Sequence, residues 1–257
     1  MNSTVLITGA SGGIGEELAR LFAAHGHDLV LVARSADKLQ SLGGELARTH
    51  GIQSRVLTAD LADPAAPPRL FDTLQVQGVA IDALVNNAGF GARGAYAEIA
   101  YEVEARMIQV NVAALAHLTR LFLPGMLARR NGKILNVAST AGYVPGPFMA
   151  VYYASKAFVL SFSEAIAEET QGSGVTVTAL VPGPTETNFA ATAGNQDTPL
   201  FRAGAVMSAA AVARVGFDGL MAGKRVAVAG FSNKLTVLST RLAPRSMLAK
   251  ITRKLNS

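Results

Sequence analysis

The sequence contains neither cysteine nor tryptophan among its 257 residues. Without cysteine the chain forms no disulfide, and it has no thiol nucleophile and no cysteine-based metal site. The histidines are not clustered as metal ligands would be, so we interpret them as structural or solvated and predict no metal site. They are His25, His27, His50 and His117.

Long apolar runs and targeting signals are also missing. No uninterrupted apolar run approaches the roughly 20 residues that a membrane-spanning helix needs. The chain starts Met1-Asn2-Ser3-Thr4 and continues directly into an apolar strand, without the basic region and cleavage site of a signal peptide. We therefore expect a cytoplasmic protein. Half of the residues are hydrophobic, so the chain can bury a sizeable core.

Acidic residues are absent from the segment 219–257, although the whole chain has 18 of them. Eight basic residues lie in this segment, and the rest of the chain has a net charge of −3. The eight are Lys224, Arg225, Lys234, Arg241, Arg245, Lys250, Arg253 and Lys254. No nucleic-acid-reading motif accompanies them, so we predict no nucleic-acid partner. We favour a solvated basic tail, and a surface that meets anionic lipid or an acidic carrier is the alternative.

A glycine-rich loop follows the first apolar run. The run ends at Thr8, the loop covers residues 9–15, and apolar residues then recur at helical spacing from Ile14 to Phe22. A strand, a glycine loop and a helix in this order bind phosphate, because the backbone approaches the ligand and the helix start offers free N–H groups. Glu16 stands where a Walker loop needs lysine, which excludes that class.

The second strand, residues 29–33, ends in Arg34 and Ser35. In dinucleotide-binding folds an acidic residue here binds the ribose 2′-hydroxyl, whereas arginine accommodates a 2′-phosphate. No carboxylate stands at this strand end, which favours NADP(H) over NAD(H). The alternative is that Arg34 merely caps the strand at the surface.

Strands alternate with helices along the rest of the chain. This rhythm predicts one doubly wound α/β domain over residues 1–257, with a mostly parallel seven-stranded sheet and helices on both faces. Asp60, which ends the third strand, either accepts from an adenine amino group or caps the next turn. Residues 188–223 break the rhythm and are interpreted as a substrate-loop region. Residues 231–257 form the basic C-terminal extension.

Two candidate catalytic side chains begin an apolar helix. Tyr152 and Lys156 are four residues apart, which places both on one helix face. A neighbouring ammonium favours tyrosinate and is expected to lower the pKa of the phenol, which suits general acid–base catalysis. Ser139 ends the preceding strand and can bond the same substrate oxygen. Tyr-x-x-x-Lys also occurs by chance on amphipathic helices, and Tyr153 competes for the role at a spacing of three.

An asparagine, Asn111, lies within a long apolar helical region between residues 102 and 129. Such a residue usually satisfies a backbone group or marks a kink. The alternative is that it holds a water or a carbonyl group in a proton path to Lys156.

Together these residues resemble the short-chain dehydrogenase/reductase family, whose motifs occur here in order across residues 4–187. The matching residues are Thr8 to Gly15, Asp60, Asn86 to Gly89, Asn111, Ser139, Tyr152, Lys156, Pro182 and Gly183. The resemblance implies a Rossmann fold, Tyr152 rather than Tyr153 as proton donor or acceptor, and Lys156 at the nicotinamide ribose. It implies that Ser139 polarises the substrate oxygen and that Asn111 supports a water relay. Gly12 replaces a second basic residue found in some NADP-preferring members, which leaves NAD(H) as the alternative cofactor.

We therefore predict an NADP(H)-dependent oxidoreductase that acts on a carbonyl or secondary alcohol and forms homodimers or homotetramers. Its predicted cofactor contacts are Gly9, Ser11, Gly13, Ile14, Gly15, Arg34, Asp60, Leu61, Asn87, Ala88, Gly89, Tyr152, Lys156, Pro182, Gly183, Thr185 and Thr187. An apolar substrate is suggested by Phe90, Tyr96, Phe148, Met149 and Phe189. The alternatives are a non-catalytic NADPH-binding or sensor protein, and a lipid carbonyl reductase docked on a membrane by the basic tail.

Overall fold

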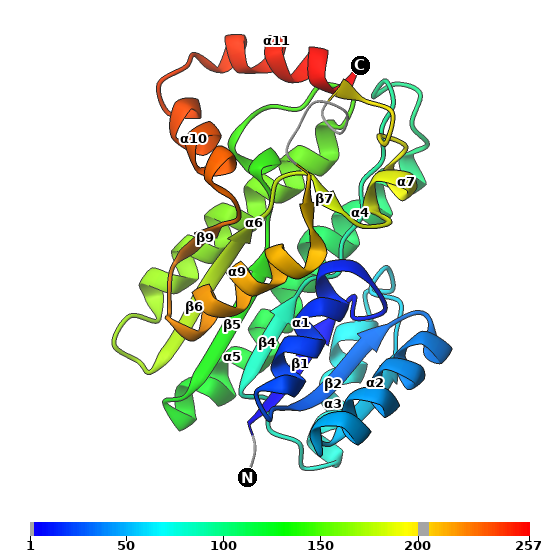
Figure 1. Cartoon of the computed structure of the whole chain (residues 1–257), viewed down its shortest axis with the longest axis vertical. Helices are drawn as coiled ribbons and strands as arrows, with labels where there is room; N and C mark the ends of the chain where they lie inside the picture. The colour runs from blue at the N-terminus through cyan, green and yellow to red at the C-terminus, as the bar shows by residue number, and fades with distance from the viewer. Residues whose placement is uncertain (1–2, 200–205) are drawn as a thin grey trace.

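Seven strands form one twisted sheet in the computed structural model, which describes residues 3–199 and 206–257 (Figure 1). The strand order is β3-β2-β1-β4-β5-β6-β9, and all pairings within this sheet are parallel. The strands are β1 (Thr4–Thr8), β2 (Asp28–Ala33), β3 (Ser54–Thr58), β4 (Ala83–Asn86), β5 (Gly132–Val137), β6 (Val175–Val181) and β9 (Val226–Val228). The predicted doubly wound α/β fold is confirmed.

Helices cover both faces of the sheet. They are α1 (Gly13–Ala24), α2 (Ala36–His50), α3 (Ala66–Val76), α4 (Tyr101–Ile108), α5 (Leu115–Arg129), α6 (Ala150–Glu169), α7 (Phe189–Ala193), α9 (Ala209–Met221), α10 (Phe231–Thr240) and α11 (Arg245–Asn256). One apolar core lies between the sheet and α1, α2 and α9, and a second lies between the sheet and α3, α5 and α6. This double covering explains why central strands such as β1 are continuous apolar runs.

The predicted substrate-loop region 188–223 divides into parts with different surroundings. The helix α7 lies near the carboxyl end of the sheet (Figure 1), and the short strand β8 (Met207–Ser208) pairs with β7 (Thr185–Glu186). By contrast, α9 belongs to the core, because Val212, Phe217 and Leu220 are buried among residues of α1 and the sheet. Residues 200–205 of the predicted region lie outside the described residues.

The long helical region 101–129 contains α4, a π-helical turn η1 (Gln109–Ala114) and α5. Among the described residues it is the one helix whose length and composition would allow it to cross a membrane. In this fold Leu118, Phe122 and Met126 of α5 are buried in the second core. The region therefore serves as a core helix, and Asn111 lies in its π-helical turn.

The basic extension folds into the helices α10 and α11 at the upper end of Figure 1. On α11 the residues Leu248, Thr252 and Asn256 are buried, and their spacing of four places them on one face. The favoured interpretation of a merely solvated tail is therefore wrong for this inner face.

Candidate active site

The carboxyl ends of β1 and β4 lie side by side where the strand order reverses, and side chains join them there. Thr8 Oγ1 donates to the carbonyl of Val85 at 3.2 Å and accepts from the amide of Asn87 at 3.0 Å. The Asn87 side chain in turn donates to the carbonyls of Thr8 at 2.9 Å and Gly9 at 3.2 Å. Doubly wound sheets bind their ligands at such a reversal point.

The glycine loop between β1 and α1 needs glycine for two reasons. Gly9 and Gly13 have φ values of +67° and +58°, which L-residues with a side chain rarely adopt. A Cβ on Gly15 would lie 2.3 Å from the carbonyl oxygen of Gly9, so only glycine lets α1 begin this close to β1. The resulting helix N-terminus at the end of a strand is an arrangement that binds phosphate.

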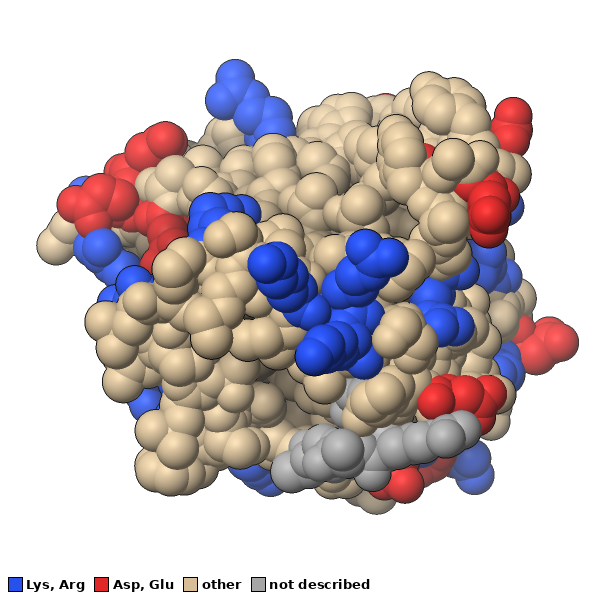
Figure 2. Space-filling model, turned by 90° about the horizontal axis from the view of Figure 1, so that it is seen from above, with Lys and Arg blue, Asp and Glu red and all other residues tan. Residues whose placement is uncertain are grey.

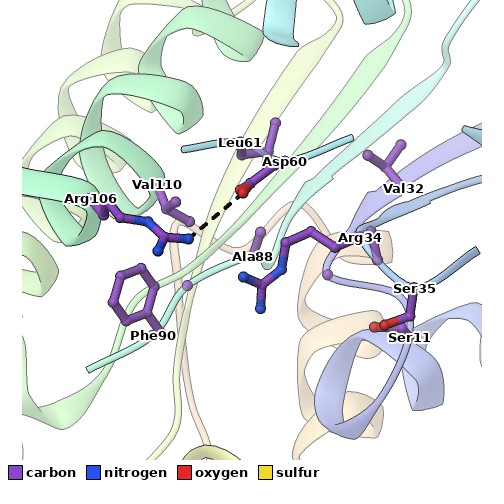
Figure 3. A pocket seen from close by; sticks show the side chains of 13 residues that line it. Ser11, Val32, Arg34, Ser35, Asp60, Leu61, Ala88, Phe90, Arg106 and Val110 are labelled. Atoms are coloured by element: carbon purple, nitrogen blue, oxygen red, sulfur yellow. Dashed lines mark ion pairs between the residues drawn. The ribbon is translucent and has the colours of Figure 1, made fainter. Parts of the chain in front are cut away.

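A cavity of about 180 Å³ lies beside the end of β2 (Figure 3). The predicted cofactor residues that line it are Gly9, Ser11, Arg34, Asp60, Leu61, Ala88 and Gly89. Asp60 Oδ1 accepts from the amide of Ala62 at 3.0 Å, which is the turn-capping role considered from the sequence. Its other oxygen lies 3.7 Å from Nη2 of Arg106.

Arg34 and Arg106 enter this cavity from opposite sides (Figure 3). Arg106 pairs with Asp60, whereas Arg34 takes part in none of the ion pairs found among residues 3–199 and 206–257. Lys38, in the first turn of α2, lines the neighbouring larger cavity together with Arg34. A cation without a carboxylate partner at the end of β2 suits an anionic group such as a 2′-phosphate.

Tyr152 and Lys156 project from the same face of α6, as their spacing predicts. The Nζ atom of Lys156 lies 5.9 Å from the centre of the Tyr152 ring and donates to the carbonyl of Val137 at 2.7 Å. A Cβ on Gly89 would come within 3.5 Å of the same nitrogen. The glycine at this position therefore leaves space beside the amine.

Burial raises the pKa of the Tyr152 phenol above its ordinary value, and a hydrogen bond with Ser139 opposes this effect. The expectation that Lys156 lowers this pKa is wrong for the folded chain by itself. Burial also lowers the pKa of Lys156 to about 8, so this amine loses its proton at a lower pH than an ordinary lysine does. Tyr152 is therefore held as a neutral phenol, which is the form that donates a proton.

Asn111 is 1% exposed and is not among the residues that line either cavity. Its side chain accepts from the amide of Phe90 at 3.1 Å and donates to the Phe90 carbonyl at 2.9 Å. It also donates to Ser155 Oγ at 3.1 Å. Asn111 therefore ties the segment after Gly89 to α6, which matches the backbone-satisfying role considered from the sequence.

A second cavity, of about 620 Å³, joins the glycine loop to the predicted catalytic side chains. The predicted residues that line it are Gly9, Ser11, Gly13, Ile14, Arg34, Asn87, Ala88, Gly89, Ser139, Tyr152, Lys156, Pro182, Gly183, Thr185 and Thr187. Gly15 is the one predicted cofactor residue that lines neither of these two cavities, and its role is the close packing of α1. Segments that are far apart in the sequence thus converge on one continuous site.

The end of this cavity beyond Tyr152 is mainly apolar. Phe189 of α7 packs against Tyr152 with 5.1 Å between ring centres, and Met149 and Phe90 also line the cavity. Tyr96 and Phe148, which were expected with them, are not among the lining residues. The inner faces of α10 and α11 complete the wall with Thr236, Val237, Ser239, Thr240, Leu248, Ile251, Thr252 and Leu255.

Sequence reasoning missed this helical wall and the basic residues Lys38 and Arg106. For the helical wall a signal was present, because Leu248, Thr252 and Leu255 recur at spacings of four and three. Lys38 could also have been considered, because it stands in the first turn of the helix that follows Arg34. For Arg106 no local pattern exists, since its approach to Asp60 depends on the packing of α4 across the sheet.

Comparison with known proteins agrees with this geometry. The model of the short chain dehydrogenase family matches residues 3–198. Dehydrogenase/reductase SDR family member 7B of Bos taurus is 37% identical over 202 residues, which are 76% of this chain and 62% of the bovine protein. Very-long-chain 3-oxoacyl-CoA reductase of Anas platyrhynchos is 34% identical over 190 residues, which are 71% of this chain and 59% of the duck protein. The matched part therefore spans less than two thirds of both relatives.

A solved structure resembles nearly the whole chain. The short-chain dehydrogenase from Sphingobium yanoikuyae in complex with NADPH matches with a TM-score of 0.83 and 33% sequence identity, and the match covers 93% of each chain. The glycine loop, the parallel sheet and the family match over most of the chain lead to one conclusion. This protein belongs to the short-chain dehydrogenase/reductase family and is an oxidoreductase with a nucleotide-binding Rossmann-type fold.

Proposed function

We propose that this protein is an NADP(H)-dependent oxidoreductase that interconverts a carbonyl compound and a secondary alcohol, with Tyr152 as general acid and base. The observation that carries the proposal is the single cavity that holds Tyr152, Lys156 and Ser139 at one end and the glycine loop with Arg34 at the other. The residues fit the cofactor, because glycine leaves room at the loop and beside Lys156. Bound NADP(H) would supply or accept the hydride.

The protein's own part in the reaction is to orient the substrate and to move a proton. Tyr152 donates its phenolic proton to the carbonyl oxygen in reduction and takes it back in oxidation. Ser139, which bonds Tyr152, orients the same oxygen. Lys156 is held by the carbonyl of Val137 and faces the space beside Gly89, where its amine can bind a ribose hydroxyl and support the charge of Tyr152.

An apolar substrate of considerable size fits the cavity better than a small polar one. The volume of about 620 Å³ is shared between cofactor and substrate, and the part beyond Tyr152 is lined by Met149, Phe189 and the α10–α11 wall. One relative is named for the reduction of very-long-chain 3-oxoacyl-CoA, which is a carbonyl compound with a long apolar chain. We therefore place the substrate among lipophilic ketones, oxoacyl chains included.

Replacing Tyr152 tests the proposal directly. Tyr152→Phe keeps the ring and removes only the hydroxyl, so NADPH binding should persist while turnover of lipophilic ketones falls about 100- to 10,000-fold. Tyr153→Phe is the matched control, because the hydroxyl of Tyr153 bonds Asn256 at 3.2 Å and should be dispensable for chemistry. A Tyr152→Phe enzyme with full turnover contradicts the assigned role, and NADPH binding without turnover in the wild type favours a sensor.

We further propose a homodimer or homotetramer formed through the outer faces of α4, α5 and α6. These helices expose the apolar residues Ile108, Leu127 and Phe158, which are 48%, 37% and 39% exposed. Exposed apolar side chains on neighbouring helices favour association. Light scattering after size exclusion measures the oligomeric state, and a monomer at micromolar concentration contradicts this proposal.

A further inference from the structure

The outer face of α10 carries an apolar stripe that the fold does not cover. Phe231, Leu235 and Leu238 follow one another at spacings of four and three, which places them on one side of the helix, and Leu242 lies just beyond the end of the helix at Thr240. They are 76%, 53%, 58% and 87% exposed. A row of large apolar side chains at this exposure marks an interaction surface rather than an ordinary solvated face.

Basic side chains surround this stripe, and no acidic residue occurs anywhere between residues 231 and 257. The exposed basic residues of the two helices are Lys234, Arg241, Arg245, Lys250, Arg253 and Lys254. Figure 2 views the molecule from this end, and blue side chains gather in the middle of the face while red ones lie toward its edges. The surface thus combines apolar side chains with positive charges and no negative ones.

The orientation of α11 is fixed by contacts on its inner side. The hydroxyl of Tyr153 donates to Asn256 Oδ1 at 3.2 Å, and Asn256 Nδ2 donates to the carbonyl of Pro147 at 3.0 Å. Arg93 Nε donates to the carbonyl of Asn256 at 2.6 Å. These bonds hold the inner face of α11 toward the cavity. Met247 lies on the other side of the helix and is 53% exposed.

A second copy of the chain is a poor occupant for this surface, because it would bring its own basic residues against these without any carboxylate to meet them. An anionic bilayer satisfies both components at once. Acyl chains take up the apolar stripe, and headgroup phosphates meet the long basic side chains around it. We propose that the outer face of α10 and α11 docks the protein on a membrane surface that contains anionic lipid.

Docking at this face would let a substrate enter the cavity directly from the bilayer. This consequence rests on the proposed function. The inner sides of the same helices line the large cavity, through Val237 of α10 and through Leu248 and Ile251 of α11. Docking brings this wall next to the bilayer, where a lipophilic ketone is dissolved. The binding experiment below needs no substrate, so its result is independent of whether the proposed reaction is correct.

Co-sedimentation with vesicles tests the docking surface. The full chain should bind vesicles of phosphatidylcholine with phosphatidylserine, release in high salt, and ignore vesicles of phosphatidylcholine alone. A stripe variant with Leu235→Gln, Leu238→Gln and Leu242→Gln should bind at least about tenfold more weakly. A charge variant with Arg241→Gln, Lys250→Gln and Lys254→Gln should bind about 100-fold more weakly, since each cation near an anionic surface contributes roughly fivefold.

Matched controls remove the same groups elsewhere. Val76 on α3 is 90% exposed, and Val76→Gln should bind vesicles like the wild type. Exchanging the exposed residues Arg48, Arg120 and Lys224 for glutamine removes three charges away from α10 and α11 and should weaken binding much less. Circular dichroism and NADPH binding should be unchanged in every variant, because none of the exchanged residues lines the cavities.

Two results would overturn the proposal. In the first, the wild type fails to bind anionic vesicles, or the charge control weakens binding as much as the charge variant does. In the second, the stripe variant binds vesicles like the wild type but forms a smaller oligomer in light scattering, which assigns the stripe to a contact between copies.

Discussion

Replacing Arg34 by glutamine should convert a preference for NADPH into near-equal use of NADPH and NADH. Arg34 lines both cavities at the end of β2, and it takes part in none of the ion pairs found in the described part of the chain. Its guanidinium is therefore available for the 2′-phosphate that distinguishes NADPH from NADH.

The size of the expected loss follows from one charge-assisted hydrogen bond, between the Arg34 guanidinium and the 2′-phosphate. A hydrogen bond to a charged group contributes about 1.5–3 kcal/mol, which corresponds to a change of about 10- to 150-fold in kcat/KM. Arg34 is exposed, so screening by solvent places the expected loss near the lower end, at about tenfold for NADPH. The value of kcat/KM for NADH should change less than about twofold, because NADH has no phosphate at this position.

The assay follows consumption of the reduced nicotinamide by absorbance, with one lipophilic ketone and each cofactor in turn. Lys38→Gln should give a smaller loss for NADPH, because this amine lines only the larger cavity. Arg48→Gln is the matched control, since Arg48 lies near the other end of α2 and donates to the carbonyl of Gly44 at 3.1 Å. Equal losses for NADPH and NADH in Arg34→Gln, or a wild type that prefers NADH, would refute the reasoning.

Three further perturbations follow from the packing of the site. Gly15→Ala places a Cβ 2.3 Å from a backbone oxygen and should cost about 1–3 kcal/mol of stability in thermal melts, whereas Gly12→Ala, with open space around it, should cost less. Asn256→Ala leaves Tyr153 without its partner and should raise KM for the ketone several-fold without changing KM for NADPH. Lys156 has a pKa of about 8 in the fold against 10.5 in the unfolded chain. Between these values the unfolded state binds more protons, so stability should rise with pH by up to about 3 kcal/mol in urea melts, and Lys156→Met should lack this rise.

The fold was predictable because local and global signals agree. The glycine loop, the alternation of apolar strands with amphipathic helices, and the polar residues at strand ends all indicate the same doubly wound sheet. The apolar run 175–181 predicts the strand β6 with its observed bounds, and the run 225–230 is longer than the strand β9 by one residue at the start and two at the end. The predicted cofactor residues apart from Gly15 line the two cavities, although the contacts themselves, the cytoplasmic location and the undivided domain stay predictions.

The parts that sequence did not predict depend on packing between distant segments. The basic segment 231–257, taken alone, is compatible with a solvated tail until α11 is placed against Pro147 and Tyr153. Likewise, spacing alone puts Tyr152 and Lys156 together but says nothing of how deeply either group is buried. Burial decides the sign of both pKa shifts, and it became known only with the surrounding helices in place.

The pKa shifts of Tyr152 and Lys156 together describe the protonation of the site without ligands. Burial disfavours charge on Tyr152 and on Lys156 alike, so the phenol is neutral at neutral pH and the amine loses its charge above a pH of about 8. The carbonyl of Val137 satisfies the amine in this state, and Ser139 bonds the phenol. Since a neutral phenol is a proton donor, this is the state of Tyr152 that the proposed carbonyl reduction needs. Oxidation requires the pKa of Tyr152 to fall, and the positive charge of an oxidised nicotinamide beside it would act in that direction.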